Sequence, residues 1–191
     1  MGGAGPLLHG AVTRLLGISG SLQARSSNRG LLELARRDTR DADVVLYSSV
    51  GALPHFDPDL ERDGVPPAVV ADWRARVLAA DGLLLASPEY AHGIPGSLKN
   101  ALDWLVGSGE LYDKPVAVLS ASPRAYGATY VRSMLEQTLH AQGARVVVSE
   151  TVEVPTGRDA AAEPAGSSIT RAVLAAVDAL LAPEVSRSRI S

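Results

Sequence analysis

Hydroxyl and amide side chains are concentrated in one segment near the start of the chain, residues 17–28. The segment reads Gly-Ile-Ser-Gly-Ser-Leu-Gln-Ala-Arg-Ser-Ser-Asn and lies between a short apolar run and a stretch with helical spacing. The free N–H groups at the start of a helix, together with the positive end of its dipole, favour an anion. Small hydroxyl side chains let the oxygens of that anion come close. The segment therefore predicts a phosphate-binding loop.

The residues of this segment exclude two well-known kinds of phosphate-binding loop. It lacks both the Gly-Lys-Ser/Thr of a P-loop and the G-x-G-x-x-G of a dinucleotide-binding loop. A third type, lined by serine, threonine and asparagine, holds the monophosphate of flavin mononucleotide (FMN). The alternative is structural: Ser26, Ser27 and Asn28 are residue types that commonly cap a helix without binding any ligand.

A second segment, residues 87–96, combines polar groups with a stiff backbone. It reads Ser-Pro-Glu-Tyr-Ala-His-Gly-Ile-Pro-Gly, so two prolines and two glycines restrict its shape. A stiff loop with exposed N–H groups and one tyrosine can hold a flat polar ring. For a flavin, donors near N1 and C2=O stabilise the negative charge that develops on reduction. Taken alone, Tyr90 would be an ordinary half-buried tyrosine.

The elements around these two segments must position them. Five short apolar runs predict β-strands, and the stretches between them have the spacing of amphipathic helices. The predicted strands are residues 12–18, 43–47, 82–86, 115–120 and 145–148. The predicted helices are residues 28–37, 68–80, 97–106, a fourth around 131–139 and a last one around 169–181. This alternation is typical of a parallel sheet covered by helices on both faces.

Five strand–helix units predict a doubly wound α/β fold with a five-stranded parallel sheet. Because the crossover connections are right-handed, the sheet must reverse its winding to carry helices on both faces, and ligands bind at that reversal. In the flavodoxin-like strand order 2-1-3-4-5 the reversal lies between the first and third strands. Residues 17–28 and 87–96 follow those two strands, so we expect them to form one site. Residues 155–168 are expected to be a long connection.

The composition excludes several classes of protein. The chain has 191 residues, no cysteine and a formal net charge of −3. It has room for one ordinary domain, cannot form a disulfide or use a thiolate, and has no basic field for nucleic acid. No apolar run approaches the ~18 residues of a membrane span, and the start does not resemble a signal peptide. We expect a single cytoplasmic domain, residues 1–191, with loose ends at 1–10 and 183–191.

Other residues that could do chemistry form weaker patterns. The four histidines are scattered and lack metal-ligand spacing, so we expect no metal site. No G-x-S-x-G motif marks a hydrolase nucleophile. His92 could stack near a substrate or face solvent. Tyr126 and Tyr130 could cover a substrate, although the core is the preferred place for Tyr130. Trp104 is either a core residue or part of a dimer contact.

Both segments belong to longer motifs that resemble those of a known family. Residues 20–28 fit G-S-L-x-x-x-S-x-N, and residues 87–104 fit S-P-E-Y-x-H-G-x-P-G-x-L-K-N-A-x-D-W. Across about residues 12–150 the chain resembles the NADPH-dependent FMN reductase family, which includes bacterial quinone, chromate and azo-dye reductases. Residues 53–60 also look like the family's loop after the second strand.

The resemblance implies non-covalently bound FMN, NADPH or NADH as electron donor, and a homodimer or tetramer. It implies that hydride passes from NAD(P)H through flavin N5 to a small acceptor such as a quinone or a flavin, with no catalytic side chain required. Carried over to this sequence, the family's cofactor contacts fall in three loops. They are Ser19, Ser21, Leu22, Gln23, Ser26 and Asn28 in the first, Pro88, Glu89, Tyr90, Ala91 and Gly93 in the second, and Ser122 to Gly127 in the third. The resemblance places Ser21, Ser26 and Asn28 around the phosphate, and the second group beside the isoalloxazine.

Two positions differ from the family's usual residues. Gln23 stands where an arginine usually pairs with the phosphate, and Ala91 stands where an asparagine is usual. Arg25 or Arg29 would be the substitute for the missing charge. The alternative function is therefore a non-catalytic binding module or an electron carrier of the same fold, with weakened or altered FMN binding.

Overall fold

The computed structural model describes residues 12–61 and 64–183, and these form a five-stranded parallel sheet. The strand order is β2-β1-β3-β4-β5, which confirms the doubly wound arrangement expected from the sequence. The ends expected to be loose, 1–10 and 183–191, lie outside the described residues except for Pro183. The strands are β1 (Thr13–Ser19), β2 (Ala42–Tyr47), β3 (Gly82–Ala86), β4 (Pro115–Ser122) and β5 (Arg145–Glu153).

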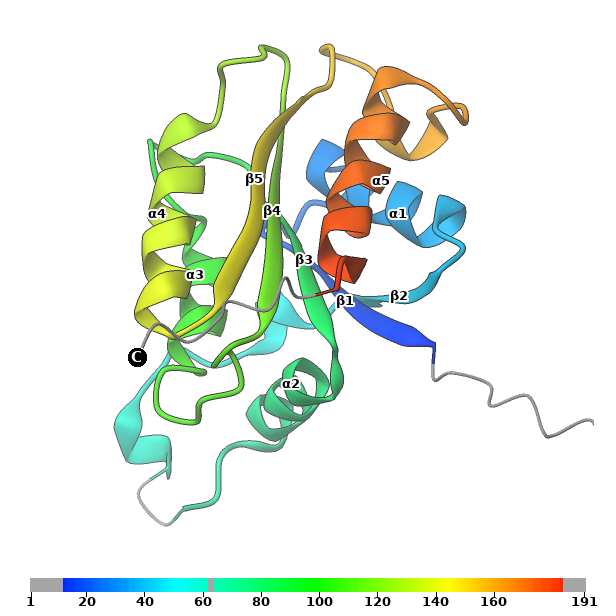
Figure 1. Ribbon diagram of the computed structural model, residues 1–191. Helices are drawn as coiled ribbons and strands as arrows, with labels where there is room; N and C mark the ends of the chain where they lie inside the picture. The colour runs from blue at the N-terminus through cyan, green and yellow to red at the C-terminus, as the bar shows by residue number, and fades with distance from the viewer. Residues whose placement is uncertain (1–11, 62–63, 184–191) are drawn as a thin grey trace, which may run out of the picture.

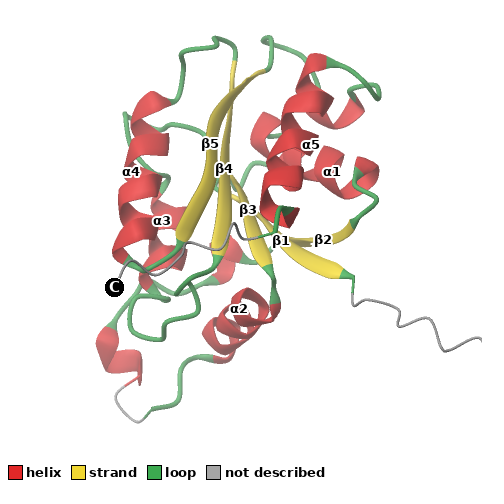
Figure 2. Ribbon diagram, viewed as in Figure 1, coloured by secondary structure: helices red, strands yellow, loops and turns green. Residues whose placement is uncertain are grey.

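Helices cover both faces of this sheet. In Figure 1, α1 and α5 lie on one side of the sheet, and α3 and α4 lie on the other. Figure 2 shows the strands as the layer between the two groups. Helix α2 joins the α3–α4 side, because Val70 and Trp73 pack in one core cluster with Leu98 and Val131. The helices are α1 (Ser27–Asp38), α2 (Ala68–Ala79), α3 (Gly96–Asp103), α4 (Thr129–Ala141) and α5 (Ser168–Leu181).

Each face of the sheet has its own apolar core, because side chains alternate along a strand. On β1, Leu16 and Ile18 belong to the cluster under α2, α3 and α4, whereas Leu15 belongs to the cluster under α1 and α5. Every residue of β3 is buried. A central parallel strand is covered on both faces, which explains the uninterrupted Leu83–Leu85 run in the sequence.

Two strands continue beyond the ends expected from the sequence. β4 runs to Ser122 instead of residue 120, and β5 runs to Glu153 instead of residue 148. The additional part of β5 contains Ser149 and Glu150, and it pairs with β4 as far as Ser122 and Glu153. Main-chain hydrogen bonds to β4 hold this part of the edge strand, although polar side chains break its apolar pattern.

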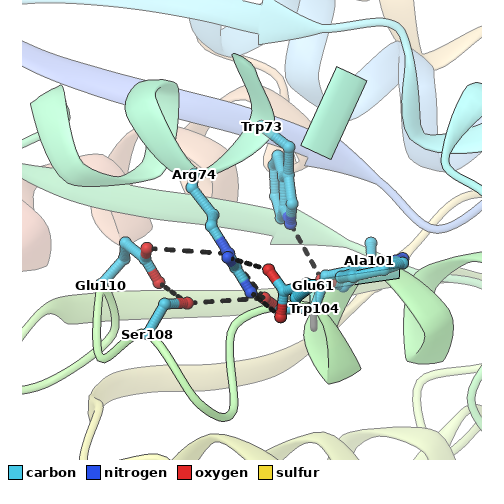
Figure 3. A network of polar contacts seen from close by, with 7 residues as sticks. All are labelled: Glu61, Trp73, Arg74, Ala101, Trp104, Ser108 and Glu110. Atoms are coloured by element: carbon cyan, nitrogen blue, oxygen red, sulfur yellow. Dashed lines mark hydrogen bonds and ion pairs between the residues drawn. The ribbon is translucent and has the colours of Figure 1, made fainter. Parts of the chain in front are cut away.

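Helix α3 ends at Asp103, before the residue 106 expected from the sequence. The carbonyl oxygen of Trp104 accepts two hydrogen bonds from Arg74 of α2, at 2.9 and 2.7 Å. Figure 3 shows this network, in which Arg74 also contacts Glu61 and Glu110. Because side chains satisfy carbonyls at the end of α3, the chain beyond it continues in tighter i→i+3 turns.

Trp104 lies in the core. Its side chain is fully buried, its Nε1 donates to the Pro54 carbonyl at 2.8 Å, and the Phe56 ring packs edge-on at 5.1 Å. These contacts attach the loop after β2 to α3. The expectation that Trp104 forms part of a dimer contact is therefore wrong, and the alternative that it is a core residue is confirmed.

Candidate functional site

The loops after β1 and β3 lie side by side at the carboxyl edge of the sheet. The Gly20 N–H donates to the Ala86 carbonyl at 2.8 Å, and the hydroxyl oxygens of Ser21 and Tyr90 are 3.5 Å apart. A Cβ on Gly20 would lie 2.6 Å from the Ser87 hydroxyl oxygen, so glycine permits this close approach. The structure thus brings together the two segments that the sequence singled out.

Ser19 and Ser21 shape the β1–α1 loop through their hydroxyls. The Ser19 hydroxyl accepts from the Ser21 N–H at 3.2 Å and donates to the Ser21 carbonyl at 3.0 Å. The Ser21 hydroxyl accepts from the Gln23 N–H at 3.2 Å. Ser21 is buried, whereas the side chains of Leu22 and Gln23 are exposed. These contacts form a tight turn between the end of β1 and the start of α1.

The first turn of α1 offers donors that the protein itself does not use. Ser26 precedes the helix, but its hydroxyl makes no capping hydrogen bond, and the first turn contains no acidic side chain. Within residues 12–61 and 64–183, the N–H groups of Ser27 and Asn28 have no acceptor. Ser26 is therefore not an ordinary side-chain cap. The turn keeps the free N–H groups that an anion such as a phosphate requires.

Asn28 connects α1 to the sheet. It is only 3% exposed, and its Oδ1 accepts a hydrogen bond from the Ala121 N–H of β4 at 2.9 Å. This oxygen is therefore committed to the protein. Any contact between Asn28 and a phosphate would come from its main-chain N–H or its Nδ2 group, which are donors.

The β3–α3 loop contains a tight turn between Tyr90 and Gly93. The Tyr90 N–H donates to the Gly93 carbonyl at 3.2 Å, and the Gly93 N–H donates to the Tyr90 carbonyl at 2.9 Å. The two residues between them have positive φ, 49° at Ala91 and 61° at His92, as in a type I′ turn. In the described part of the chain, the N–H groups of Glu89, Ala91 and His92 have no acceptor. They are the kind of donor that the polar edge of a flat ring needs.

The carboxylate of Glu89 points to the start of α4. One oxygen accepts from the Tyr130 N–H at 2.9 Å and the Val131 N–H at 3.1 Å. The other oxygen lies 3.2 Å from Nδ1 of His92. Pro88, the residue before it, is half-buried. The side chain of Glu89 is thus used within the protein, whereas its main-chain N–H has no acceptor among the described residues.

The loop after β4 leads directly into α4. The Ser122 hydroxyl accepts from the Arg124 N–H at 3.2 Å, and a Cβ on Gly127 would lie 1.9 Å from that hydroxyl oxygen. The Gly127 carbonyl accepts from the Thr151 hydroxyl at 2.7 Å. Glycine is therefore required at position 127 for the loop to fold back on Ser122 before α4 begins.

Aromatic side chains are exposed around this edge of the sheet. Tyr90 is 53% exposed, Tyr126 is 94% exposed, and Tyr130 is 60% exposed. The ring of His92 stacks edge-on against Tyr130, with 4.7 Å between the centroids. The expectation that Tyr130 lies in the core is wrong, because the next residue, Val131, is the one that α4 turns inward.

A cleft of about 450 Å³ opens between the start of α1 and the β5–α5 connection. A Cβ on Gly30 would lie 2.9 Å from the Ala161 nitrogen, so the two segments pack closely. The cleft includes Ser26 of the expected phosphate loop, and its other wall is residues 157–161. The sequence did not indicate this second wall, because nothing local distinguishes a glycine and an arginine in the connection after β5.

Charged side chains line this cleft, and arginines outnumber carboxylates. Within the described residues, Arg25 has no hydrogen-bond or ion-pair partner. Arg158 donates to Glu163 at 2.5 Å, and this hydrogen bond lowers the pKa of the Glu163 carboxyl below its ordinary value. The charged lining residues are Arg25, Arg29, Arg158, Glu33 and Asp159.

Residues 12–61 and 64–183 contain no group of three or more histidine and carboxylate side chains that could hold a metal ion. None of the helices there is long and apolar enough to cross a membrane.

The strand order, with the donor-rich loops at the switch between β1 and β3, defines a flavodoxin-like α/β protein. Among solved structures, a flavoenzyme NAD(P)H:(acceptor) oxidoreductase from Paracoccus denitrificans is similar, with a TM-score of 0.67 and 26% identity over 89% of this chain and 98% of that one. Oxidised flavodoxin 1 from Bacillus cereus shares the fold at a TM-score of 0.58 and 16% identity, over 90% of this chain and 100% of that one.

The family model for NADPH-dependent FMN reductases matches residues 13–159, so the chain belongs to this family. An NAD(P)H-dependent FMN reductase from Pseudomonas aeruginosa is 37% identical over 66% of this chain and 69% of that protein. An NAD(P)H:quinone oxidoreductase from Solanum tuberosum is 40% identical over 58% of this chain. The alignment spans only 59% of the S. tuberosum protein.

Proposed function

We propose that this chain is an FMN-dependent NAD(P)H oxidoreductase, which passes hydride from NADPH or NADH through flavin N5 to a small acceptor such as a quinone or a flavin. One observation supports this proposal most strongly: two loops with free N–H donors lie at the same edge of the sheet. They are the uncapped first turn of α1 and the β3–α3 turn, and the hydrogen bond from the Gly20 N–H to the Ala86 carbonyl holds the loops together. Membership of the FMN reductase family and the names of the relatives support the proposal.

The protein's part in this reaction is to bind and orient. When bound, FMN supplies the hydride chemistry. The N–H groups of Ser27 and Asn28 and the hydroxyl of Ser26 would hold the phosphate at the positive end of α1. The free N–H groups of the β3–α3 turn would hold the polar edge of the ring, with residues 122–127 on its other side. No side chain is assigned as a catalytic acid or base.

The same proposal includes the protein's partners. The exposed rings of Tyr90, Tyr126 and Tyr130 give a quinone-like acceptor flat apolar surfaces to stack on. The resemblance to the family supports a homodimer or tetramer. A chain without cysteine suits the reducing cytoplasm, where we place it.

Titration of the apoprotein with FMN, followed by NADPH and NADH, tests the proposed activity. We expect bound flavin whose visible absorbance bleaches with a pyridine nucleotide and returns when a quinone is added. A protein that takes up no FMN contradicts the proposal and favours the binding module. A protein that holds FMN and reacts with neither nucleotide favours the electron carrier.

The exposed Gln23 allows a separate test of the phosphate subsite. Gln23→Arg adds a guanidinium beside the first turn of α1, and a charge-assisted hydrogen bond contributes roughly 1.5–3 kcal/mol. We therefore expect FMN to bind about tenfold more tightly or better, measured by flavin fluorescence. Riboflavin, which lacks the phosphate, serves as the control ligand and should bind both proteins equally. An unchanged affinity for FMN, or an equal gain for riboflavin, would contradict this subsite.

A further inference from the structure

Glu89 supplies the cap that helix α4 lacks. The residue before α4 is Ala128, which has no polar side chain and has a positive φ of 59°, and the first turn contains no acidic residue. The Glu89 carboxylate instead accepts the N–H groups of Tyr130 and Val131 from outside the helix. A carboxylate at a helix N-terminus satisfies free donors and also interacts favourably with the helix dipole.

The same carboxylate is attached to the β3–α3 turn. It belongs to the residue before Tyr90, and its second oxygen lies 3.2 Å from Nδ1 of His92 inside the turn. The side chain of Glu89 is about one-fifth exposed, which shields its contacts with α4, whereas the side chain of His92 is mostly exposed. Both Ala91 and His92 have positive φ, which is unfavourable for residues with a Cβ. The Glu89 carboxylate therefore adds a contact from outside the turn to the two hydrogen bonds between Tyr90 and Gly93 within it.

The geometry points to Glu89 as a positioning residue: by capping α4, it fixes the β3–α3 turn in the shape that aims the N–H groups of Glu89 and Ala91 at the flavin ring. This inference rests on the proposed function. It gives Glu89 a side-chain role separate from any main-chain contact with the ring. It also predicts that the ring subsite, and not the phosphate subsite, depends on this carboxylate.

Two variants and two flavins test the inference. Glu89→Ala removes both hydrogen bonds to α4, whereas Glu89→Gln keeps an acceptor oxygen at the same reach. We expect Glu89→Ala to weaken the binding of FMN and of riboflavin by the same factor, about tenfold, because the two ligands share the isoalloxazine ring. Glu89→Gln should recover most of the affinity. Glu150 is an exposed carboxylate on β5, so Glu150→Gln is the matched control and should bind both flavins normally.

Amide hydrogen exchange of the apoprotein tests the cap without any flavin. Exchange of the Tyr130 and Val131 amides should become faster in Glu89→Ala and change less in Glu89→Gln. Unchanged exchange overturns the cap. Faster exchange in Glu89→Ala together with normal flavin affinity overturns the positioning role. A loss of affinity for FMN alone, with riboflavin binding unchanged, also overturns it.

Glu89→Gln keeps the inference testable if Glu89→Ala does not fold. In that case we expect Glu89→Gln to show a smaller loss of affinity, equal for FMN and riboflavin. A normal affinity of Glu89→Gln for both flavins overturns the positioning role. If the unmodified protein binds neither flavin, the proposed function fails, and with it the positioning role. The exchange measurement then reports separately on the α4 cap.

Discussion

At the scale of single residues, the backbone of the β3–α3 turn explains why asparagine suits position 91, but it gives no reason for the alanine of this chain. Ala91 has φ 49°, a left-handed conformation in which asparagine and glycine are less strained than alanine. The asparagine usual at this position therefore has a conformational role that alanine fills less well. This reason does not depend on any contact between the side chain and a ligand.

Ala91→Asn should stabilise the protein. We expect the free energy of unfolding to rise by about 0.5–1 kcal/mol, since asparagine adopts positive φ at lower cost. Ala91→Val is the control, because a β-branched side chain is strained there, and it should lower the free energy of unfolding. Denaturant melts of the three proteins measure both changes. A valine variant as stable as the asparagine variant would show that the turn does not have this conformation.

At the scale of elements, Arg74 holds three segments together. From α2 it donates to the Trp104 carbonyl at the end of α3, and it contacts Glu61 before α2 and Glu110 after α3 (Figure 3). Its side chain is 16% exposed, so these contacts are largely shielded from solvent. The network fixes where α3 ends, and α3 follows directly from the β3–α3 loop.

Arg74→Ala should destabilise the protein by about 3 kcal/mol, because it leaves largely buried carboxylates and a carbonyl without their partner. Arg76 lies on the same helix and pairs with Asp72, but both side chains are 48% exposed. Arg76→Ala is therefore the matched control, and we expect little change. Thermal and denaturant unfolding measure both variants. Equal losses for the two arginines would mean that the network does not contribute to stability.

At the scale of the whole molecule, the cleft beside α1 joins segments that are far apart in the sequence. Arg25 belongs to the loop after β1, and Arg158 belongs to the connection after β5. Arg37 fixes this arrangement from α1, because its guanidinium donates to the carbonyls of Ala161 and Glu163 at 2.6 and 2.8 Å. Positive charge is thereby gathered near a loop that has glutamine at position 23.

Arg158→Gln should weaken FMN binding by about tenfold at low ionic strength and by less at high salt, because salt screens exposed charges. Riboflavin should be unaffected, since it carries no phosphate. Arg76→Gln, on the other side of the sheet, controls for the loss of one positive charge. Fluorescence titrations at two salt concentrations measure these affinities. An unchanged affinity for FMN would show that the cleft does not contribute to the phosphate subsite.

The sequence was most informative where structure depends on neighbouring residues. Alternating strands and helices predicted a doubly wound parallel sheet, because apolar periodicity reports which side chains a local element buries. The same reasoning was wrong for Tyr130, and it ended β5 and α3 at the wrong residues. At the ends of β5 and α3, a partner distant in the sequence decides the outcome: β4 for β5, and Arg74 for α3.

The sequence by itself determined that the polar segments 17–28 and 87–96 lie at the carboxyl ends of the first and third strands, since residue types and local spacing are sufficient for that. Only the tertiary structure decided that Glu89 caps α4, that Ser26 leaves its helix uncapped, and that Arg158 lines a cleft beside it. These facts depend on hydrogen bonds and packing between segments distant in the sequence. No local pattern encodes which of many polar side chains will meet across such a distance.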